Sequence, residues 1–338
     1  MAVDVSKVDY SLILLTPDGR EITIDNLLLN ASLEENGGEL AARLQVLMKN
    51  IKRADGWIHQ HVYLARRLIL KATDGNGWNE IFRGSVYRWK TIAKDHTIEF
   101  TAYDPLYPLQ QSKDHWYFSS GETGASSIKK IASKWGIAVG RIDGPHVKLS
   151  KKPYSNNTLG DIIADRLKES KDKGSGRFIV RSNKGKLECV KEASNSVIYI
   201  LDDNYVEDSS DERSIENLVT RVKIYGNEDK EGRATLKATK DGETKFGIIQ
   251  EVVYSDAYEN LNDAKKAADE ILKEDGKPKV ERVLTGPDIP WIRKGDMVEV
   301  MTGTIGSSRN GVSVPISCVV ESVSRDISEK RITLFLRG

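Results

Sequence analysis

The sequence predicts a mostly β protein with an α+β part, in which an α+β module separates two small β-barrel domains. Segments that alternate polar and apolar residues recur from Tyr10 to Phe335, as half-buried strands do. Clusters of Gly, Pro, Asn and Asp punctuate these segments in the way that turns do. Only three stretches follow the period of an α-helix, and all three lie beyond the first third of the chain.

Residues 1–112 are predicted to form the first barrel. Its first two strands flank a turn in which Pro17 fixes φ and Gly19 accepts a positive φ. Strands are expected at 10–15, 21–25, 40–48, 62–72, 80–90 and 97–102, with a second strong turn at 74–77. Six or seven short antiparallel strands without a long helix are typical of a small barrel or a two-sheet sandwich.

Residues 113–195 are predicted to form the α+β module. Gly136 ends its first helix, and Thr158 with Asp161 three residues later resembles the start of its second. The expected elements are helices at 128–135 and 159–167, a flexible tip at 171–176 and a hairpin of 178–180 with 187–190.

Residues 196–338 are predicted to form the second barrel, with a helical insertion at 259–275 that Gly276 and Pro278 terminate. Strands are expected at 220–226, 234–238, 246–254, 280–285, 297–301, 312–325 and 331–336. Two barrels of similar size suggest an internal duplication, although no residue-level repeat accompanies them.

The composition excludes several classes of protein. Of the 338 residues, 51 are Lys or Arg and 50 are Asp or Glu, so a net charge of +1 gives no global attraction to nucleic acid or to an anionic membrane. The longest apolar run at the N-terminus, 12–15, is too short for a signal peptide or a membrane span. Cys189 and Cys318 lack metal-ligand spacing and are expected to be buried or half-buried thiols of a protein made in a reducing cytoplasm, with a disulfide between them as the open alternative.

A search for catalytic groups finds no complete site. His59 and His61 fall on one side of a predicted strand, but no third ligand completes a metal site, which favours a structural or surface role. The glycine-rich stretches 174–176 and 303–308 lack the order of a phosphate-binding loop and are predicted to be loops or hairpin tips. Paired carboxylates leave a glycosidase open, yet no stretch of ~120 residues remains for such a domain. We therefore expect no enzyme activity and no catalytic, cofactor-binding or metal-binding residues.

Charge is distributed unevenly along the chain. The first barrel is locally basic, and an acidic stretch precedes the second barrel. The basic residues are Lys49, Lys52, Arg53, Arg66, Arg67 and Lys71, and the acidic ones are Asp202, Asp203, Glu207, Asp208, Asp211, Glu212 and Glu216. Two interpretations remain open: these residues form solvated faces, or the opposite patches meet between neighbouring subunits of a ring.

Tryptophans offer a further alternative. Trp57, Trp78, Trp89, Trp116 and Trp291 can stack on sugars, although most are expected in the core or in interfaces. The alternatives to a structural role are therefore a peptidoglycan-degrading enzyme and a cell-wall-binding β protein.

Several segments resemble the contractile-tail baseplate hub family, the XkdQ-type or late-control-gene-D-like proteins found in phage tails and R-type bacteriocins. In the first barrel, Phe82-Arg83-Gly84-Ser85-Val86 precedes a strand that ends in Ala102-Tyr103-Asp104. The linker carries Ser119-Ser120-Gly121-Glu122-Thr123 before its first helix. Further along come the segments 215–226 and 241–250, with Phe246 where the family commonly has Tyr, then the helix from Asn260 and the run 292–300. The segments span nearly the whole chain in the family's order.

The resemblance implies an architectural role. Hubs of this family are homotrimers in which two similar barrels per chain form a pseudo-six-fold ring, a symmetry adaptor between the hexameric tail tube and the trimeric central spike. The implied partners are the tail tube or tube-initiator protein, the spike, and baseplate wedge and LysM-type tail proteins, without membrane or sequence-specific nucleic acid. The implied location is the baseplate of a phage tail or tail-like particle.

Overall fold

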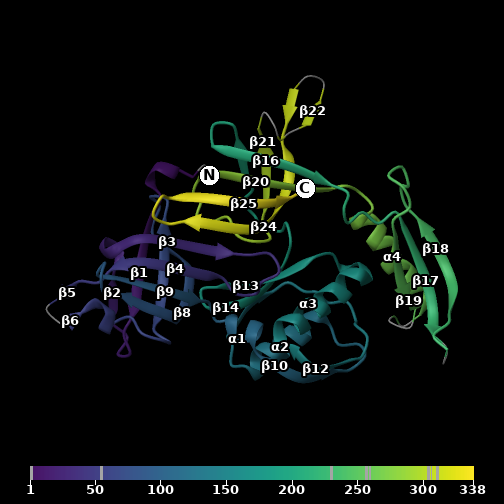
Figure 1. The fold of residues 1–338 in the computed structure, drawn as a ribbon, viewed down its shortest axis with the longest axis horizontal. Coiled ribbons are helices and arrows are strands. Elements are labelled where there is room, and N and C mark those ends of the chain that lie inside the picture. The colour runs from purple at the N-terminus through teal and green to yellow at the C-terminus, as the bar shows by residue number, and fades with distance from the viewer. Residues whose placement is uncertain are drawn as a thin grey trace.

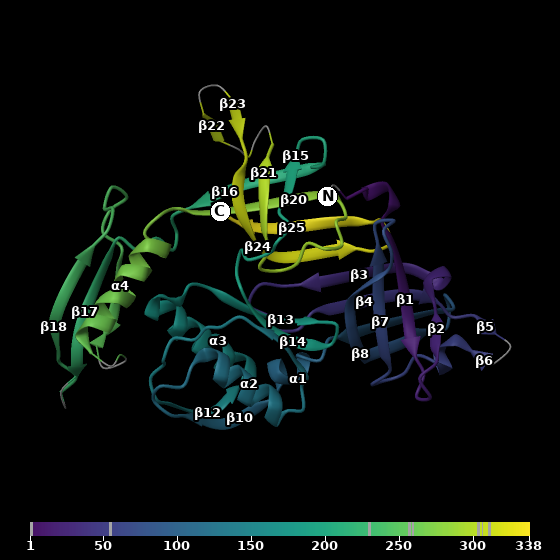
Figure 2. The ribbon, with the colours of Figure 1, turned by 180° about the vertical axis from the view of Figure 1, so that it is seen from behind.

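The structure is a computed structural model that describes residues 3–53, 56–228, 231–255, 258, 260–302, 305, 307–309 and 312–338 (Figure 1). Two sets of strands lie next to each other, one from each end of the chain. The α+β module lies below them, and a small unit with one helix stands at the side (Figures 1 and 2). No described helix is long and apolar enough to cross a membrane.

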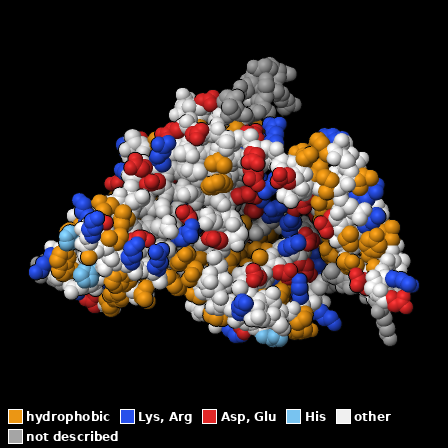
Figure 3. Space-filling view, in the orientation of Figure 1, with side chains coloured by type: hydrophobic (Ala, Val, Ile, Leu, Met, Phe, Trp, Pro, Cys, Tyr) orange, Lys and Arg blue, Asp and Glu red, His pale blue; other side chains and the backbone are white. Residues whose placement is uncertain are grey.

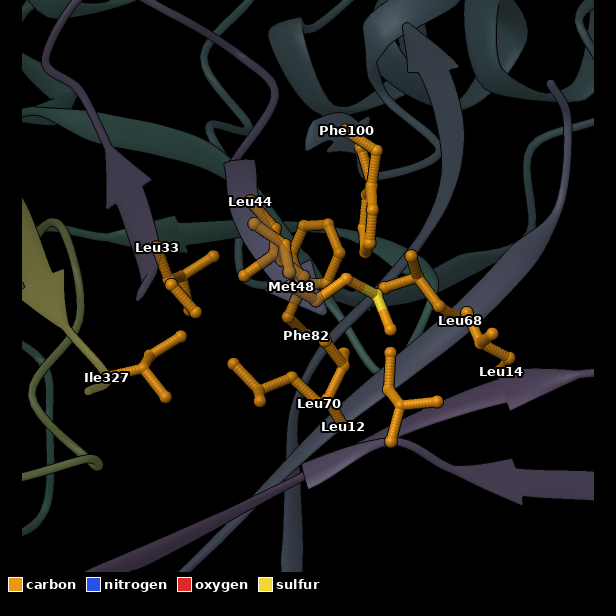
Figure 4. Packing of buried hydrophobic residues seen from close by; sticks show 14 of the residues in the cluster. Leu12, Leu14, Leu33, Leu44, Met48, Leu68, Leu70, Phe82, Phe100 and Ile327 are labelled. Atoms are coloured by element: carbon orange, nitrogen blue, oxygen red, sulfur yellow. The ribbon is translucent and has the colours of Figure 1, made fainter. Parts of the chain in front are cut away.

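The first strand set begins at β1 and ends at β9. Its strands are β1 (Asp9–Leu15), β2 (Glu21–Thr23), β3 (Leu28–Glu35), β4 (Arg43–Lys49), β7 (Arg67–Thr73), β8 (Asn79–Ile92) and β9 (Thr97–Tyr103), and β5 (Lys52–Arg53) pairs separately with β6 (Gly56–Trp57). The predicted turn after β1 is confirmed, because the amide of Thr16 donates to the carbonyl of Arg20 at 2.8 Å and Gly19 has φ +84°. Apolar side chains of these strands, among them Leu12, Met48 and Phe100, converge on one core (Figure 4).

The second strand set comes from the C-terminal part of the chain. It contains β15 (Tyr199–Asp202), β16 (Asp208–Ser214), β20 (Lys279–Pro287), β21 (Met297–Met301), β24 (Ile316–Asp326) and β25 (Arg331–Arg337), while β22 (Ser307–Arg309) and β23 (Val312–Val314) form a separate hairpin. Cys318, Val320 and Leu334 belong to its own core. The strands predicted at 280–285, 297–301 and 331–336 are therefore confirmed, whereas the one predicted at 312–325 is divided between β23 and β24.

The mostly β class is confirmed, but the expected closed barrels are wrong. Among the described residues, both strand sets belong to one 13-stranded sheet with the path β16-β20-β25-β24-β3-β4-β9-β8-β7-β1-β2, and no sheet closes on itself. β3 pairs antiparallel with β24, with Glu35 opposite Val323 and Ser32 opposite Asp326. The backbone groups along the edge of β3 therefore pair with β24 of the second strand set instead of closing a barrel, since an edge strand can pair with any available partner.

The α+β module has the two helices and the hairpin that the sequence predicts. Its elements are α1 (Tyr107–Gln111), β10 (Lys113–Phe118), α2 (Gly124–Lys134), β11 (Val139–Ile142), β12 (Lys152–Thr158), α3 (Leu159–Ser170), β13 (Phe178–Asn183) and β14 (Lys186–Lys191). Thr158 caps α3 by accepting the amide of Asp161 at 3.0 Å. The expected flexible tip at 171–176 is wrong, because a π-helical turn (Lys171–Ser175) continues α3, and Ser175 Oγ donates back to the carbonyl of Ser170 at 2.6 Å.

The strands predicted at 220–226, 234–238 and 246–254 and the helix predicted at 259–275 do not join the second strand set. They form a unit of their own. β17 (Arg221–Glu228), β18 (Ala234–Asp241) and β19 (Gln250–Tyr254) make a sheet of order β18-β17-β19, and α4 (Leu261–Asp275) packs on one face of it. We call this the α4 unit. Val222 and Ile224 of β17 meet Ala264 and Ala268 of α4 in a separate small core. The period-2 pattern was therefore correct for strands, but it could not tell which sheet they join. The division of the chain at 112 and 195 stays a prediction.

Candidate assembly surfaces and a buried ion network

The loop between β20 and β21 carries charged side chains that join distant parts of the chain. Arg293 donates from Nε to Oε1 of Glu35 at 2.5 Å and from Nη2 to the carbonyl of Ser182 at 2.8 Å. Glu35 ends β3 and Ser182 lies on β13, so one guanidinium connects the first strand set, the module and the second strand set. Asp296 accepts from the amide of Arg293 at 2.9 Å and from Nη1 of Arg181 at 3.0 Å. We call these residues the buried network.

Glu35 is 3% exposed, so its carboxyl group depends on this network for its charge. Burial by itself raises the pKa of an acid, but Arg293 beside it outweighs burial and lowers the pKa of Glu35 to about 2. Glu35 is therefore ionised at neutral pH, and its pairing with Arg293 compensates for the loss of water.

Lys294 and Asp104 extend the buried network into the first strand set. Lys294 donates from Nζ to the carbonyls of Asn36, at 3.1 Å, and Glu39. Burial lowers its pKa. The carboxyl of Asp104 accepts the amides of Ala42 at 2.9 Å and Leu106 at 2.8 Å. Burial raises the pKa of Asp104 to about 7, and the nearby Glu35 adds to that rise.

A second buried group joins the two strand sets near the start of the chain. Tyr10 on β1 donates its hydroxyl to Asp288, which follows β20. Asp288 lies 3.3 Å from Nε of Arg325 on β24, and Arg325 donates to the carbonyl of Ile292. Burial raises the pKa of Asp288, while Arg325 opposes that rise. Because each of these groups is almost fully buried, the geometry of this junction is fixed by hydrogen bonds rather than by apolar contact alone.

Two glycines of the segments that resemble the hub family permit close packing. A Cβ on Gly84 would lie 2.3 Å from the carbonyl oxygen of Tyr103, so only glycine fits at this point of β8, which pairs with β9. Gly295 has φ +88°, and a Cβ there would lie 2.1 Å from Cδ1 of Ile179 on β13. The sequence analysis did not predict the buried network. The resemblance of 292–300 was the one signal that could have pointed to it.

The histidines and cysteines considered in the sequence do not form a shared site among the described residues. His59 lies in a 3₁₀ turn (Ile58–Gln60), not in the expected strand, and its Nδ1 lies 3.1 Å from Nδ2 of Asn50. The described residues contain no group of three or more His, Cys, Asp or Glu side chains placed to hold a metal. Cys189 and Cys318 are buried free thiols, as expected. In the stretch 303–308, Gly303, Thr304 and Gly306 lie outside the described residues.

The tryptophans divide into packed and exposed side chains. Trp89, Trp116 and Trp291 pack against cores, and Nε1 of Trp291 donates to Asp74 at 3.1 Å. Trp57 and Trp78 remain 36% and 50% exposed. The expectation that most of the five lie in the core or in interfaces is therefore confirmed for the three that pack against cores, and Trp57 stacks on His59.

One residue of the predicted basic patch, Arg66, is buried rather than exposed. Arg66 is 3% exposed, and its Nη1 donates to the hydroxyl of Tyr63 at 3.0 Å, so it was wrongly assigned to the surface. Arg66 lies in the turn just before β7, where its amide donates to the carbonyl of Tyr63 at 3.0 Å. Lys49, Lys52 and Arg67 are exposed.

The acidic stretch is partly occupied by contacts within the chain. Glu207 pairs with Arg331, Asp211 lies 3.7 Å from Nε of Arg282, and Asp202 accepts the amide of Asn204 at 3.0 Å. Asp208, Glu212 and Glu216 are exposed on or just after β16. Since β16 forms one end of the large sheet, the remaining acidic side chains line an edge whose other side has no strand partner among the described residues.

Exposed apolar side chains gather in three places, and Figure 3 shows two of them at the left and right ends of the molecule. The first place is the tip of the first strand set, the second is the approach to and start of β15, and the third is the α4 unit. The residues are Ile51, Trp57, Tyr63 and Leu64 at the tip, Val197, Ile198 and Ile200 near β15, and Leu236, Phe246, Ile248, Val252 and Tyr254 on the α4 unit. Apolar surface of this extent is typical of a protein that associates with others.

Comparisons with known proteins connect this architecture to a family. A family model described as YQBQ-like matches residues 67–337. Protein YqbQ of Bacillus subtilis strain 168 is 26% identical over 232 residues, which cover 67% of this chain and 70% of that protein. The phage-like element PBSX protein XkdQ of the same strain is 28% identical over 221 residues, 64% of this chain and 66% of XkdQ. The match therefore spans slightly less than two thirds of XkdQ.

Solved structures share the fold along almost the whole chain. The tail protein from Neisseria meningitidis MC58 superposes with a TM-score of 0.70 at 13% identity, covering 98% of this chain and 97% of the other. The 43 kDa tail protein of prophage MuSo2 from Shewanella oneidensis gives 0.68 at 12% identity, with coverage of 97% and 98%. The joined strand sets, the module and the α4 unit thus belong to a fold that these tail proteins share.

Proposed function

This chain belongs to the YQBQ-like family, and on that premise we propose that it is a structural part of a phage-type tail and acts there as the baseplate hub. Three copies would form a ring that joins the hexameric tail tube to the trimeric central spike. Wedge and LysM-type tail proteins would contact the outside of the ring. The protein would be made in the bacterial cytoplasm and end in the baseplate of a phage tail or tail-like particle.

The observation that carries the proposal is that one sheet contains two strand sets, each with a core of its own. Three such chains offer six strand sets, which suits the contact of a trimeric spike with a six-fold tube. The network around Arg293 and the pairing of β3 with β24 hold the two sets in one fixed relation. A fixed relation is what a symmetry adaptor needs, because both ends of the ring must match their partners at once.

Ring formation would also use the surfaces that the monomer leaves exposed. β16 and β2 end the large sheet, and sheet edges readily pair with further strands. The apolar side chains of the tip and of β15 supply area that a stable interface can bury.

The proposed role is non-enzymatic. Two of the buried cations have structural partners: Lys294 donates to backbone carbonyls and Arg293 pairs with Glu35. A peptidoglycan zymogram tests the alternative, since clearing by folded protein would contradict a purely structural role. Retention on purified cell wall that requires Trp57 or Trp78 would favour a wall-binding protein instead.

The main experiment measures assembly. The full chain is examined by light scattering, alone and after co-expression with the tube and spike proteins encoded beside it. We expect a trimer, or a monomer that becomes a trimer with the spike. A strictly monomeric chain that never co-purifies with either protein would contradict the hub proposal.

Charge reversal tests whether the basic patch takes part in assembly. Lys49→Glu with Arg67→Glu changes exposed side chains and should weaken the trimer in a salt-dependent way. The matched control reverses Lys129, an exposed residue of α2. Arg66 is left unchanged, because reversing a buried cation would unfold the chain rather than test its surface.

A further inference from the structure

Two adjoining clefts lie where the first strand set, the module, the second strand set and the α4 unit meet. The junction cleft has a volume of about 600 Å³, and the basic cleft has a volume of about 800 Å³. Arg177 and Arg337 line both, so the two clefts lie side by side, and we call them together the groove. Figure 3 shows charged side chains of both signs crowded in the hollow between the large sheet and the α4 unit.

The basic cleft is lined by seven Lys or Arg side chains and two glutamates. Lys245 and Lys273 are each tied to a glutamate, Glu243 at 2.7 Å and Glu270 at 3.3 Å, and both lysines are more than half exposed. The other cations of this cleft also have carboxylate partners, except Lys277, which has no ion pair within the described part of the chain; the paired ones are Arg177, Arg213, Lys279 and Arg337. Exposed pairs of this kind stabilise a protein by only about 0–1 kcal/mol, so an incoming carboxylate can replace the glutamates at little cost.

The junction cleft differs in chemistry from the basic cleft. Half-buried or buried apolar side chains from β13, α3 and the loop before β4 form one wall, namely Leu40, Ile163, Leu167, Phe178 and Val180. Glu39, Glu192 and Glu321 also line the junction cleft. The apolar side chains are therefore concentrated in the junction cleft and the cations in the basic cleft.

We propose that this groove binds a linear, acidic segment of a partner protein whose apolar residues enter the junction cleft while its carboxylates meet the lysines of the basic cleft. Charge complementarity and the apolar wall together favour a peptide. Binding of single-stranded nucleic acid usually relies on stacked aromatic side chains along a basic track, and only one aromatic residue, Phe178, lines either cleft. The inference does not depend on the hub proposal, since it concerns this groove and not the ring.

The test uses the full chain and four fluorescein-labelled probes in anisotropy titrations. The first is a 14-residue peptide with two leucines and a phenylalanine at one end and five glutamates at the other. The second replaces the glutamates by lysines, the third replaces the apolar residues by serines, and the fourth is a 14-nucleotide oligothymidine. We expect the first probe to bind at least tenfold more tightly than each of the others, with an affinity that falls as salt rises.

Matched variants locate the binding. Lys245→Glu combined with Lys277→Glu should weaken the first probe at least tenfold, whereas the control Lys94→Glu with Lys129→Glu, two exposed lysines outside the groove, should leave it unchanged. An unaltered thermal midpoint identifies variants that remain folded. Failure of the first probe to bind, equal binding of the oligothymidine, or a change below twofold in the groove variant would each overturn the proposal. None of these results bears on trimer formation.

Discussion

Arg293 and Glu35 are 258 positions apart in the sequence, yet Nε of the first donates to Oε1 of the second at 2.5 Å in a site that water hardly reaches. The contact joins the loop after β20 to the end of β3. It therefore joins the two strand sets at the place where β3 pairs with β24, and we call this boundary between the two sets the seam.

Removing one partner of this pair should be costly. Arg293→Ala leaves the carboxylate of Glu35 buried without its cation, and we expect a loss of roughly 3–5 kcal/mol in the free energy of unfolding. Urea unfolding followed by tryptophan fluorescence measures it, because Trp291 lies beside the seam. The control Arg20→Ala removes an exposed pair with Asp18 and should cost less than about 1 kcal/mol. Equal losses in the two variants would contradict the role of the buried network.

Acid should weaken the seam through Glu35. Its pKa lies near 2 in the folded chain, below its ordinary value of 4.5, so its stabilising contribution is complete above pH 4.5 and is lost as pH falls towards 2. The contribution amounts to about 3 kcal/mol. Unfolding curves of the wild type and of Glu35→Gln between pH 2 and pH 6 measure it. The difference in stability between the two should shrink as pH falls, and a constant difference would exclude this linkage.

Asp104 should make the protein less stable as pH rises, which is the reverse of the effect of Glu35. Its pKa is raised from 3.8 to about 7, so the folded chain holds a proton that the unfolded chain releases, and stability falls as pH rises from about 4 to 7. Asp104→Asn removes this dependence, together with one acceptor for the amides of Ala42 or Leu106. We expect the variant to be less stable at every pH but with a flatter profile over this window. A profile as steep as that of the wild type would contradict the assignment to Asp104.

Gly84 should tolerate no side chain. Gly84→Ala places a Cβ 2.3 Å from a backbone oxygen of β9 that cannot move without breaking the ladder, and we expect a loss of about 3 kcal/mol in stability. Gly160→Ala in α3 is the control, since a Cβ there meets its nearest atoms at an ordinary 3.5 Å. This second change should stabilise the protein by up to about 1 kcal/mol. Thermal midpoints compare the two, and a Gly84→Ala variant as stable as the wild type would show that β8 and β9 can separate there.

The sequence by itself determined the local structure because local structure depends on neighbours in the chain. The alternation of apolar residues located most strands of both sets but missed β3, β15 and β16, and the stripes before Gly136 and after Thr158 located α2 and α3. The burial of the two cysteines was expected from residue type and from the absence of metal-ligand spacing. Family resemblance along the chain gave the proposed role.

Only the tertiary structure decided which strands share a sheet. Alternation of polar and apolar residues indicates that a strand has one buried face, but it does not indicate which strand pairs with it. The joining of β3 to β24 and the separate sheet of the α4 unit could therefore not be predicted. The buried position of Arg66 and the network of Arg293, Glu35 and Lys294 were hidden for a related reason. Charged residues are usually exposed, and their burial becomes favourable only where the fold brings partners from distant segments within hydrogen-bonding distance.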